Sequence, residues 1–151
     1  MLVYRLCKKK YSSDLSGNGA RRYGGRWNYP GTSLVYTSEV ASLAVLEILV
    51  HLRIEDASMP FIITTLDIGN SIKVIEQKDL PKDWQRADGS IYLMNTTKTW
   101  IEEQQSVGLK VPSVILPIEN NILLNPEHPK FINVKIVAQE EFSFDKRLLF
   151  V

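Results

Sequence analysis

The chain has 151 residues, of which 44% are hydrophobic and 23% charged, and its formal net charge is +1. This length and composition are typical of one globular domain with a substantial core. The near-neutral charge gives no general electrostatic argument for binding nucleic acid or an anionic membrane. The N-terminal apolar residues precede the basic ones, which is not the order of a secretory signal, and no apolar run could span a bilayer. We therefore expect a cytoplasmic protein of one domain, residues 1–151, without direct contact to nucleic acid or membrane.

The N-terminal half predicts two strands, a long loop and one apolar helix. A strand is expected over residues 2–7, and a loop rich in glycine and proline follows to residue 31, a composition that predicts irregular structure. A short strand over 33–36 leads into an apolar helix that begins near Ser38 and reaches His51. A buried strand is then expected over 61–68, and residues 72–75 continue the sheet.

The C-terminal half predicts a second helix and further strands. Residues 76–90 are polar and interrupted by proline and glycine, which indicates irregular or weakly helical structure. A helix is predicted over 95–107, with Gly108 as its stop. Strands are expected over 109–116, 122–124 and 134–138, with one more at the edge within 142–151. Two helices among about six strands, without regular βαβ alternation, indicate an α+β fold built on a mixed or antiparallel sheet.

Glu47 does not fit the apolar helix in which it lies. Helical spacing places its carboxylate on the same face as Val40, Leu43 and Val50. An ionised carboxylate in such surroundings is costly unless it is paired, hydrogen-bonded or facing a cleft. Arg26, one predicted strand earlier, is the candidate partner. The pattern leaves two interpretations open, a catalytic pair or a structural Arg26–Glu47 ion pair in a non-enzymatic binding module.

The loop before this helix combines glycines with arginines and aromatic residues. Arg21 and Arg22 offer guanidinium groups beside an approachable backbone, which suits phosphate, and Tyr23 and Trp27 could stack on a base or a pyridine ring. The segment starting at Gly17 begins like a dinucleotide-binding fingerprint, but its third glycine is missing and no helix is predicted after it. A flexible surface loop is the alternative. The two histidines have no partners at ligand spacing, so no metal site is expected.

Six blocks of the sequence, in order, resemble the RES domain family, which is named for an Arg, a Glu and a Ser. The blocks are GGRWN (24–28), GT (31–32), VYTS (35–38), AVLE (44–47), VPS (111–113) and NPEHP (125–129). They extend over essentially the whole chain. The resemblance implies a fold similar to that of ADP-ribosyltransferase toxins, a single α+β domain around a mixed or antiparallel split sheet with a few helices.

The resemblance also implies a function. RES proteins are toxins of bacterial type II toxin–antitoxin pairs, and their partner is an Xre-like helix-turn-helix antitoxin. They degrade NAD+ by hydrolysis or phosphorolysis of the nicotinamide–ribose bond, and some transfer ADP-ribose to a protein instead. We therefore expect NAD+ as substrate, no metal, and a hetero-oligomeric complex in which the antitoxin covers the active site.

The family's site residues are carried over by position. Its Arg, Glu and Ser match Arg26, Glu47 and Ser113, and the Tyr beside them matches Tyr36, although by pattern alone Tyr36 is a core residue and Ser113 a strand-edge hydroxyl. Glu47 is expected to stabilise positive charge on the ribose, Tyr36 to stack on nicotinamide, and Ser113 to bond near the ribose. The expected NAD+-binding residues are Arg5, Arg22, Tyr23, Trp27 and Asn28.

Overall fold

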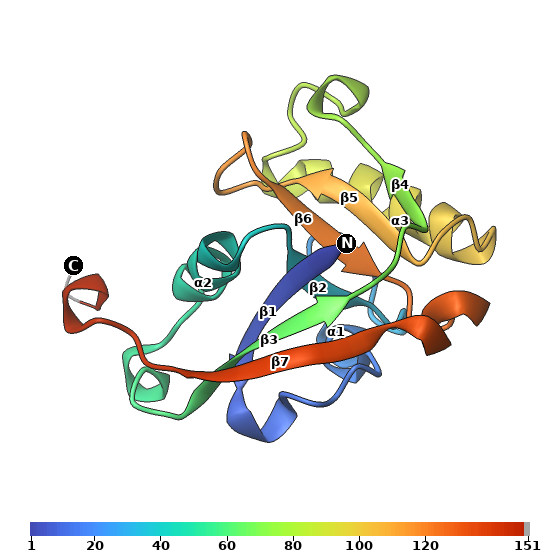
Figure 1. Cartoon of the computed structure of the whole chain (residues 1–151). Coiled ribbons are helices and arrows are strands. Elements are labelled where there is room, and N and C mark those ends of the chain that lie inside the picture. The colour runs from blue at the N-terminus through green and yellow to red at the C-terminus, as the bar shows by residue number, and fades with distance from the viewer. Residues whose placement is uncertain (150–151) are drawn as a thin grey trace.

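The structure is a computed structural model that describes residues 1–149, and its centre is one seven-stranded sheet (Figure 1). The strand order is β4-β5-β6-β2-β1-β3-β7, in which β4 and β5 are parallel and all other neighbouring strands are antiparallel. The strands are β1 (Leu2–Lys8), β2 (Val35–Ser38), β3 (Phe61–Asp67), β4 (Ile72–Val74), β5 (Gly108–Pro112), β6 (Asn120–Leu124) and β7 (Lys135–Phe142). The helices are α1 (Asn18–Tyr23), α2 (Ala41–Leu49) and α3 (Ser90–Glu102). The predicted α+β fold class is confirmed.

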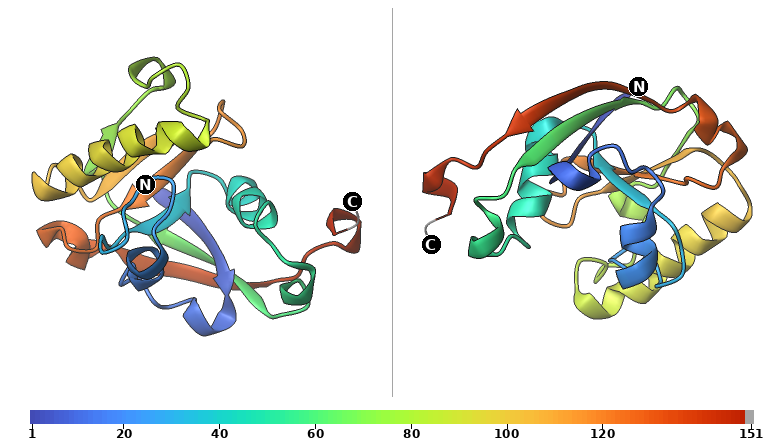
Figure 2. Two further views of the ribbon diagram at one scale, coloured as in Figure 1. Left: turned by 180° about the vertical axis from the view of Figure 1, so that it is seen from behind. Right: turned by 90° about the horizontal axis from the view of Figure 1, so that it is seen from below.

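The sheet is nearly divided between β1 and β2. These strands share one Cα pair, Tyr4 with Ser38, whereas β1 is paired with β3 over seven residues and β2 with β6 over four. Strands β1, β3 and β7 therefore form one half of the sheet, and β2, β6, β5 and β4 form the other, as the views in Figure 2 show. The mixed, split sheet that the sequence predicted is confirmed.

Strand register decides which side chains share a face of this sheet. Residues paired directly across antiparallel strands point to the same side. Ser38 is paired with Tyr4 on one neighbour and with Asn121 on the other, so these three side chains lie on one face. Helix α3 covers part of that face and packs its Leu93 and Trp100 into the main core cluster. The opposite face carries a second apolar cluster whose buried members are Val3, Val35, Leu66, Ile68, Ile122 and Leu124.

One helix is not predicted from the sequence, and another begins earlier than predicted. The glycine-rich segment contains α1, because two of its glycines lie at the ends of the helix and not within it. Gly17 precedes α1 and Gly24 follows it, with φ of 73° and 71°. The helix predicted over 95–107 begins earlier, at Ser90, because Leu93 and Trp100 belong to one buried face separated by two turns. Beyond α3 the chain turns at Gln104, and Gly108 begins β5.

The predicted edge strand over 142–151 is wrong within the described residues. The edge is β7, which ends at Phe142, and the chain then forms a 3₁₀ turn at Lys146–Leu148. Phe144 does not continue the strand, and its ring packs edge-to-face against the rings of Phe61 and Phe142. Residues 150–151 lie outside the described part. Among the helices that are described, none is both long and apolar enough to cross a membrane.

Candidate active site

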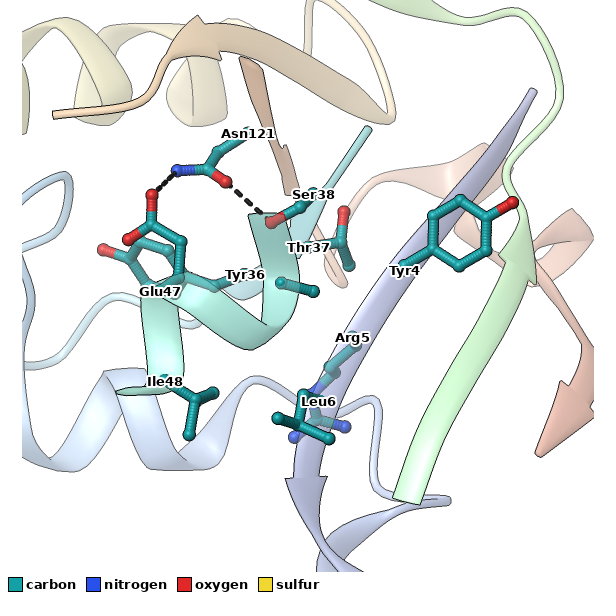
Figure 3. Close-up of a pocket in the computed structure, with 10 residues that line it drawn as sticks. Tyr4, Arg5, Leu6, Tyr36, Thr37, Ser38, Glu47, Ile48 and Asn121 are labelled. Carbon is teal, nitrogen blue, oxygen red and sulfur yellow. Dashed lines mark hydrogen bonds between the residues drawn. The ribbon is translucent and has the colours of Figure 1, made fainter. Parts of the chain in front are cut away.

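Glu47 lines a small pocket at the split of the sheet, together with residues of β1 and β2 (Figure 3). The pocket has a volume of about 80 Å³. Oε1 of Glu47 accepts hydrogen bonds from Oγ of Ser113 at 2.8 Å and from Nδ2 of Asn121 at 2.6 Å. Oε2 accepts none from the described residues, so one carboxylate oxygen is fixed by the protein while the other remains available to a ligand.

Helix α2 places the Glu47 carboxylate in the pocket because the buried face of the helix packs against the sheet. Leu43 and Ala44 are buried, and Ala44 shares a cluster with Leu6 of β1. Glu47 follows Leu43 by four positions and so lies on the same face of the helix, one turn further on. At that point the sheet is split, and Glu47 contacts the polar side chains of Ser113 and Asn121 instead of an apolar core. Of the three settings that the sequence leaves open for this carboxylate, the structure shows two, because Glu47 is hydrogen-bonded and also lines a pocket.

The side-chain amide of Asn121 is hydrogen-bonded to both Ser38 and Glu47, and the bond from Ser38 sets its orientation. Oγ of Ser38 donates to Oδ1 of Asn121 at 2.7 Å, which leaves Nδ2 of that amide to donate to Glu47, as the dashed lines in Figure 3 show. Neither Ser38 nor Asn121 is among the site residues that the sequence predicts. Their contact depends on the pairing of β2 with β6, and the only signal in the sequence is a polar pair opening an apolar strand.

Ser113 is fully buried just beyond the end of β5. Its Oγ donates to Glu47 and accepts the backbone N–H groups of Ile115 and Leu116, each at 3.1 Å. One donated and two accepted bonds use the whole capacity of a hydroxyl group. In this geometry Ser113 positions Glu47, and the expectation that it bonds near the ribose stays a prediction.

Tyr36 stands beside Glu47 in the pocket, and Asn28 and Trp27 hold its hydroxyl. Oη of Tyr36 donates to Oδ1 of Asn28 at 2.7 Å and accepts the backbone N–H of Trp27 at 3.2 Å. Burial raises the pKa of the Tyr36 phenol, and the Trp27 hydrogen bond and the Arg26 charge lower it by less. Tyr36 therefore stays neutral over the physiological range, which suits an aromatic wall better than a general base.

Asn28 and Trp27 do not face the pocket as the sequence predicted. Asn28 is 1% exposed, and its Nδ2 donates to the carbonyl oxygens of Ala20, Tyr29 and Thr32. The Trp27 ring is 3% exposed and belongs to the main core cluster. Both residues are thus supports of Tyr36 and of the surrounding loop, which corrects their assignment as direct NAD+ contacts.

Arg26 does not form an ion pair with Glu47. Its Nη1 donates to the carbonyl oxygens of Gln85 and Arg86 at 3.2 Å and 3.3 Å, which ties the turn bearing Arg26 to the segment before α3. The structural ion pair that the sequence left open is therefore wrong. Arg26 lies near enough to Tyr36 for its charge to lower the phenol pKa, so it remains at the margin of the site.

The other predicted binding residues surround a second pocket. Arg5 lines the Glu47 pocket and also a pocket of about 700 Å³, and Arg22 and Tyr23 line the larger pocket from α1. Nη1 of Arg5 donates to the carbonyl oxygens of Tyr11 and Asp14 at 3.3 Å and 2.7 Å. In residues 1–149, no group of three or more His, Cys, Asp or Glu side chains is arranged to hold a metal ion.

Fold and site together define a class of small α+β proteins with a split mixed sheet and a glutamate fixed at the split. The sequence matches the RES domain family over residues 2–145. The chain belongs to this family.

Curated relatives extend over nearly the full chain. A protein named Toxin Res from Photorhabdus laumondii is 41% identical over 99% of this chain and 97% of its own length. Another protein named Toxin Res, from Yersinia enterocolitica, is 37% identical over 98% and 99%. The Prs ADP-ribosylating toxin of a Sphingobium species is 31% identical over 91% and 88%.

A solved structure has the same fold. It is a chain from the crystal structure of the M. tuberculosis MbcT–MbcA toxin–antitoxin complex, with a TM-score of 0.79 and 16% identity. The match covers 94% of this chain and 84% of that one.

Proposed function

We propose that this protein is the toxin of a toxin–antitoxin pair and that it consumes NAD+ by cleaving the nicotinamide–ribose bond. Membership of the RES family, with two relatives named Toxin Res, supports the toxin assignment. The observation that carries the chemistry is the fixed carboxylate of Glu47, which has one oxygen held by Ser113 and Asn121 and the other open to the pocket.

The proposed reaction uses this carboxylate as an electrostatic group. When the bond between ribose C1 and the nicotinamide nitrogen breaks, its electron pair leaves with nicotinamide, which becomes neutral, and positive charge develops on the ribose. A preorganised carboxylate stabilises that charge. Water or phosphate then bonds to C1 and releases a proton, which gives ADP-ribose or its 1″-phosphate. The neutral ring of Tyr36 forms the wall against which nicotinamide stacks.

The test compares wild-type protein with Glu47→Gln. The isosteric amide can still accept both hydrogen bonds through its oxygen, so the substitution removes the charge and keeps the shape. We expect nicotinamide release from NAD+ to fall by about 100-fold or more. Glu39→Gln is the matched control, because Glu39 is a second partly buried glutamate, bonded to Lys110 and Asn120 outside the pocket. Full activity of a folded Glu47→Gln protein would refute the proposal.

A second candidate is ADP-ribosyl transfer to a cellular protein. The relative named Prs ADP-ribosylating toxin favours it, because it is 31% identical over most of both chains. Incubation with adenine-labelled NAD+, with and without phosphate and cell lysate, separates the outcomes. Free ADP-ribose indicates hydrolysis, its 1″-phosphate indicates phosphorolysis, and a labelled protein band indicates transfer.

A toxic enzyme requires a neutralising partner. The fold is shared with a chain of a toxin–antitoxin complex, and this supports the proposal of an antitoxin that covers the pocket around Glu47. By family resemblance we propose an Xre-like helix-turn-helix protein in a hetero-oligomeric complex. Co-expression with the product of the adjacent gene tests this: the partner should restore growth, co-purify with the chain and abolish NAD+ consumption.

A further inference from the structure

The segment before α3 is fixed to the core at two points. Residues 76–90, which the sequence predicts to be irregular or weakly helical, contain short 3₁₀ turns. Between these turns, Leu80 and Trp84 are 9% and 2% exposed and belong to the main core cluster. We call residues 80–86 the bridging segment. Its two buried anchors hold the polar residues that follow Trp84 in a defined place at the surface.

The bridging segment contacts the turn that carries Arg26. Nη1 of Arg26 donates to the carbonyl oxygens of Gln85 and Arg86 at 3.2 Å and 3.3 Å. Within the described residues, Nε and Nη2 of this half-buried side chain have no hydrogen-bond partner, so their N–H groups are available to a ligand. The bridging segment therefore determines where the positive charge of Arg26 lies at the margin of the site.

The same segment contacts the loop between β5 and β6, which lies beside it in Figure 1. Nε2 of Gln85 donates to the carbonyl oxygen of Val114 at 3.3 Å. Val114 directly follows Ser113, whose Oγ donates to Oε1 of Glu47 at 2.8 Å. The Gln85 amide is therefore bonded to the residue next to the serine that fixes the Glu47 carboxylate.

Gln85 thus connects the two segments that carry the charged groups of the site. Its backbone carbonyl accepts a bond from Arg26, and its side-chain amide donates one to the loop that begins at Ser113. The residue is exposed, so it adds little to the core, which Trp84 already anchors. Among the described residues, the bond to Val114 is the only hydrogen bond of the Gln85 side chain. These features distinguish Gln85 from a residue whose role is packing.

Separation of the two charges has a chemical consequence. An arginine and a glutamate that meet in a partly buried site form an ion pair, in which each charge neutralises the other. Here Arg26 is bonded to backbone carbonyls, and Glu47 is bonded to Ser113 and Asn121, so both charges stay available. A dinucleotide uses both at once, because its phosphates are anionic and its ribose becomes cationic when the nicotinamide bond breaks.

We propose that Gln85 is a positioning residue, which holds the Arg26 turn and the Ser113 loop at a fixed separation so that Arg26 and Glu47 do not pair. This inference rests on the proposed function, because it is NAD+ cleavage that requires both charges. Gln85 acts on the reaction through Ser113 and Glu47 and contacts no reacting atom. Since the Glu47 charge acts in the transition state, loss of the Gln85 amide should lower kcat and leave KM nearly unchanged.

The test removes the amide and keeps the length of the side chain. Gln85→Met lacks the donor to Val114, and we expect kcat for NAD+ to fall by about three- to tenfold, the effect of one neutral hydrogen bond. KM should change by less than about twofold. Gln85→Lys places another N–H donor at this position and should restore kcat to within about twofold of wild type. Wild-type kcat in Gln85→Met, or a loss confined to KM, would overturn the proposal.

The matched control is Gln77→Met. Gln77 is exposed and lies shortly before the bridging segment, and within the described residues its side chain makes no hydrogen bond. We expect the control to keep the wild-type kcat and KM. A loss of kcat as large as that in Gln85→Met would contradict the role of the bond to Val114, because the control leaves that bond intact.

A double variant tests the route by which Gln85 acts. If the effect passes through Ser113, Gln85→Met should lower kcat by less than about twofold in a protein that already carries Ser113→Ala. Independent losses that multiply in the double variant would overturn this route. Urea denaturation of each variant shows whether it is folded under the assay conditions, and Gln85→Met should unfold near the wild-type midpoint because the side chain is exposed.

Amide hydrogen exchange separates this inference from the proposed function, because it requires no activity. The N–H groups of Ile115 and Leu116 donate to Oγ of Ser113 and therefore report on the loop. Gln85→Met should speed their exchange by about threefold or more, whereas Gln85→Lys and Gln77→Met should not. Wild-type exchange in Gln85→Met would overturn the inference while NAD+ consumption stood. Faster exchange in a chain that cleaves no NAD+ would instead refute the proposed function and uphold the connection between Gln85 and the loop.

Discussion

Asn121 donates a 2.6 Å hydrogen bond from strand β6 to the Glu47 carboxylate on helix α2, although the two residues are 74 positions apart. A hydrogen bond to a charged group is stronger than one between neutral groups, and here it fixes the oxygen that Ser113 also holds. The amide is itself oriented by Ser38, so the carboxylate is held by an ordered sequence of contacts. This arrangement supports the first of four predictions.

Asn121→Ala should lower kcat by about tenfold and change KM for NAD+ by less than about threefold, because a lost donor to a charged group costs about 1.5–3 kcal/mol. Asn120→Ala is the control, since its amide donates to Glu39 instead. Steady-state kinetics on both variants gives the comparison. An equal effect of the two substitutions, or an effect confined to KM, would contradict the positioning role of Asn121.

Ser113→Ala should impair both stability and turnover. The substitution leaves the buried N–H groups of Ile115 and Leu116 without their acceptor, which costs about 1–3 kcal/mol of unfolding free energy. It also frees Glu47, so kcat should fall while KM stays similar. Urea denaturation and kinetics measure the two effects. Wild-type stability with low activity would indicate that Ser113 contacts the substrate directly.

Gly25→Ala should disturb Tyr36 without touching the catalytic carboxylate. A Cβ on Gly25 would lie 2.6 Å from Oη of Tyr36, closer than real Cβ atoms approach other groups, and 3.0 Å from Oδ1 of Asn28, which is also tight. The tyrosine must therefore shift, and we expect a KM for NAD+ raised by about tenfold if its ring holds nicotinamide. Gly31→Ala is a poor control because of its φ of 97°, so Gly19→Ala serves for stability.

Tyr36 should make stability fall at alkaline pH. Its pKa in the folded state is raised above the ordinary value of 10.0, chiefly by burial. Below about pH 10 the phenol is protonated in both states, so its contribution to stability is fully present. Above that pH the unfolded chain loses the proton first, and stability is lost at up to about 1.4 kcal/mol per pH unit as the pH rises toward the folded-state pKa.

The measurement is chemical denaturation of wild type and Tyr36→Phe between pH 8 and about pH 11. The variant leaves Asn28 and Trp27 without the hydroxyl, so it should be less stable near neutral pH. The difference between the two proteins should shrink above about pH 10. A constant difference across the range would mean that Tyr36 titrates alike in both states.

The sequence alone determined the elements and the identity of the central residue. Alternation and apolar runs located all seven strands and added an eighth that the described residues do not form, and the spacing around Glu47 exposed a carboxylate that needed an explanation. Local information was less reliable for helix ends. Gly17 and Gly24, in a segment whose composition predicts irregular structure, flank helix α1, and the packing of Leu93 and Trp100 sets the start of α3.

The tertiary structure decided which partners Glu47 has. Arg26 is near in sequence and was the expected partner, yet its side chain is tied to the backbone of Gln85 and Arg86. The actual partners, Ser113 and Asn121, come from strands far along the chain, and only the register of the sheet places their side chains on the face that α2 covers. The sequence indicates that the Glu47 carboxylate, a charge in apolar surroundings, needs hydrogen bonds. Which side chains donate them is determined by the pairing of the strands.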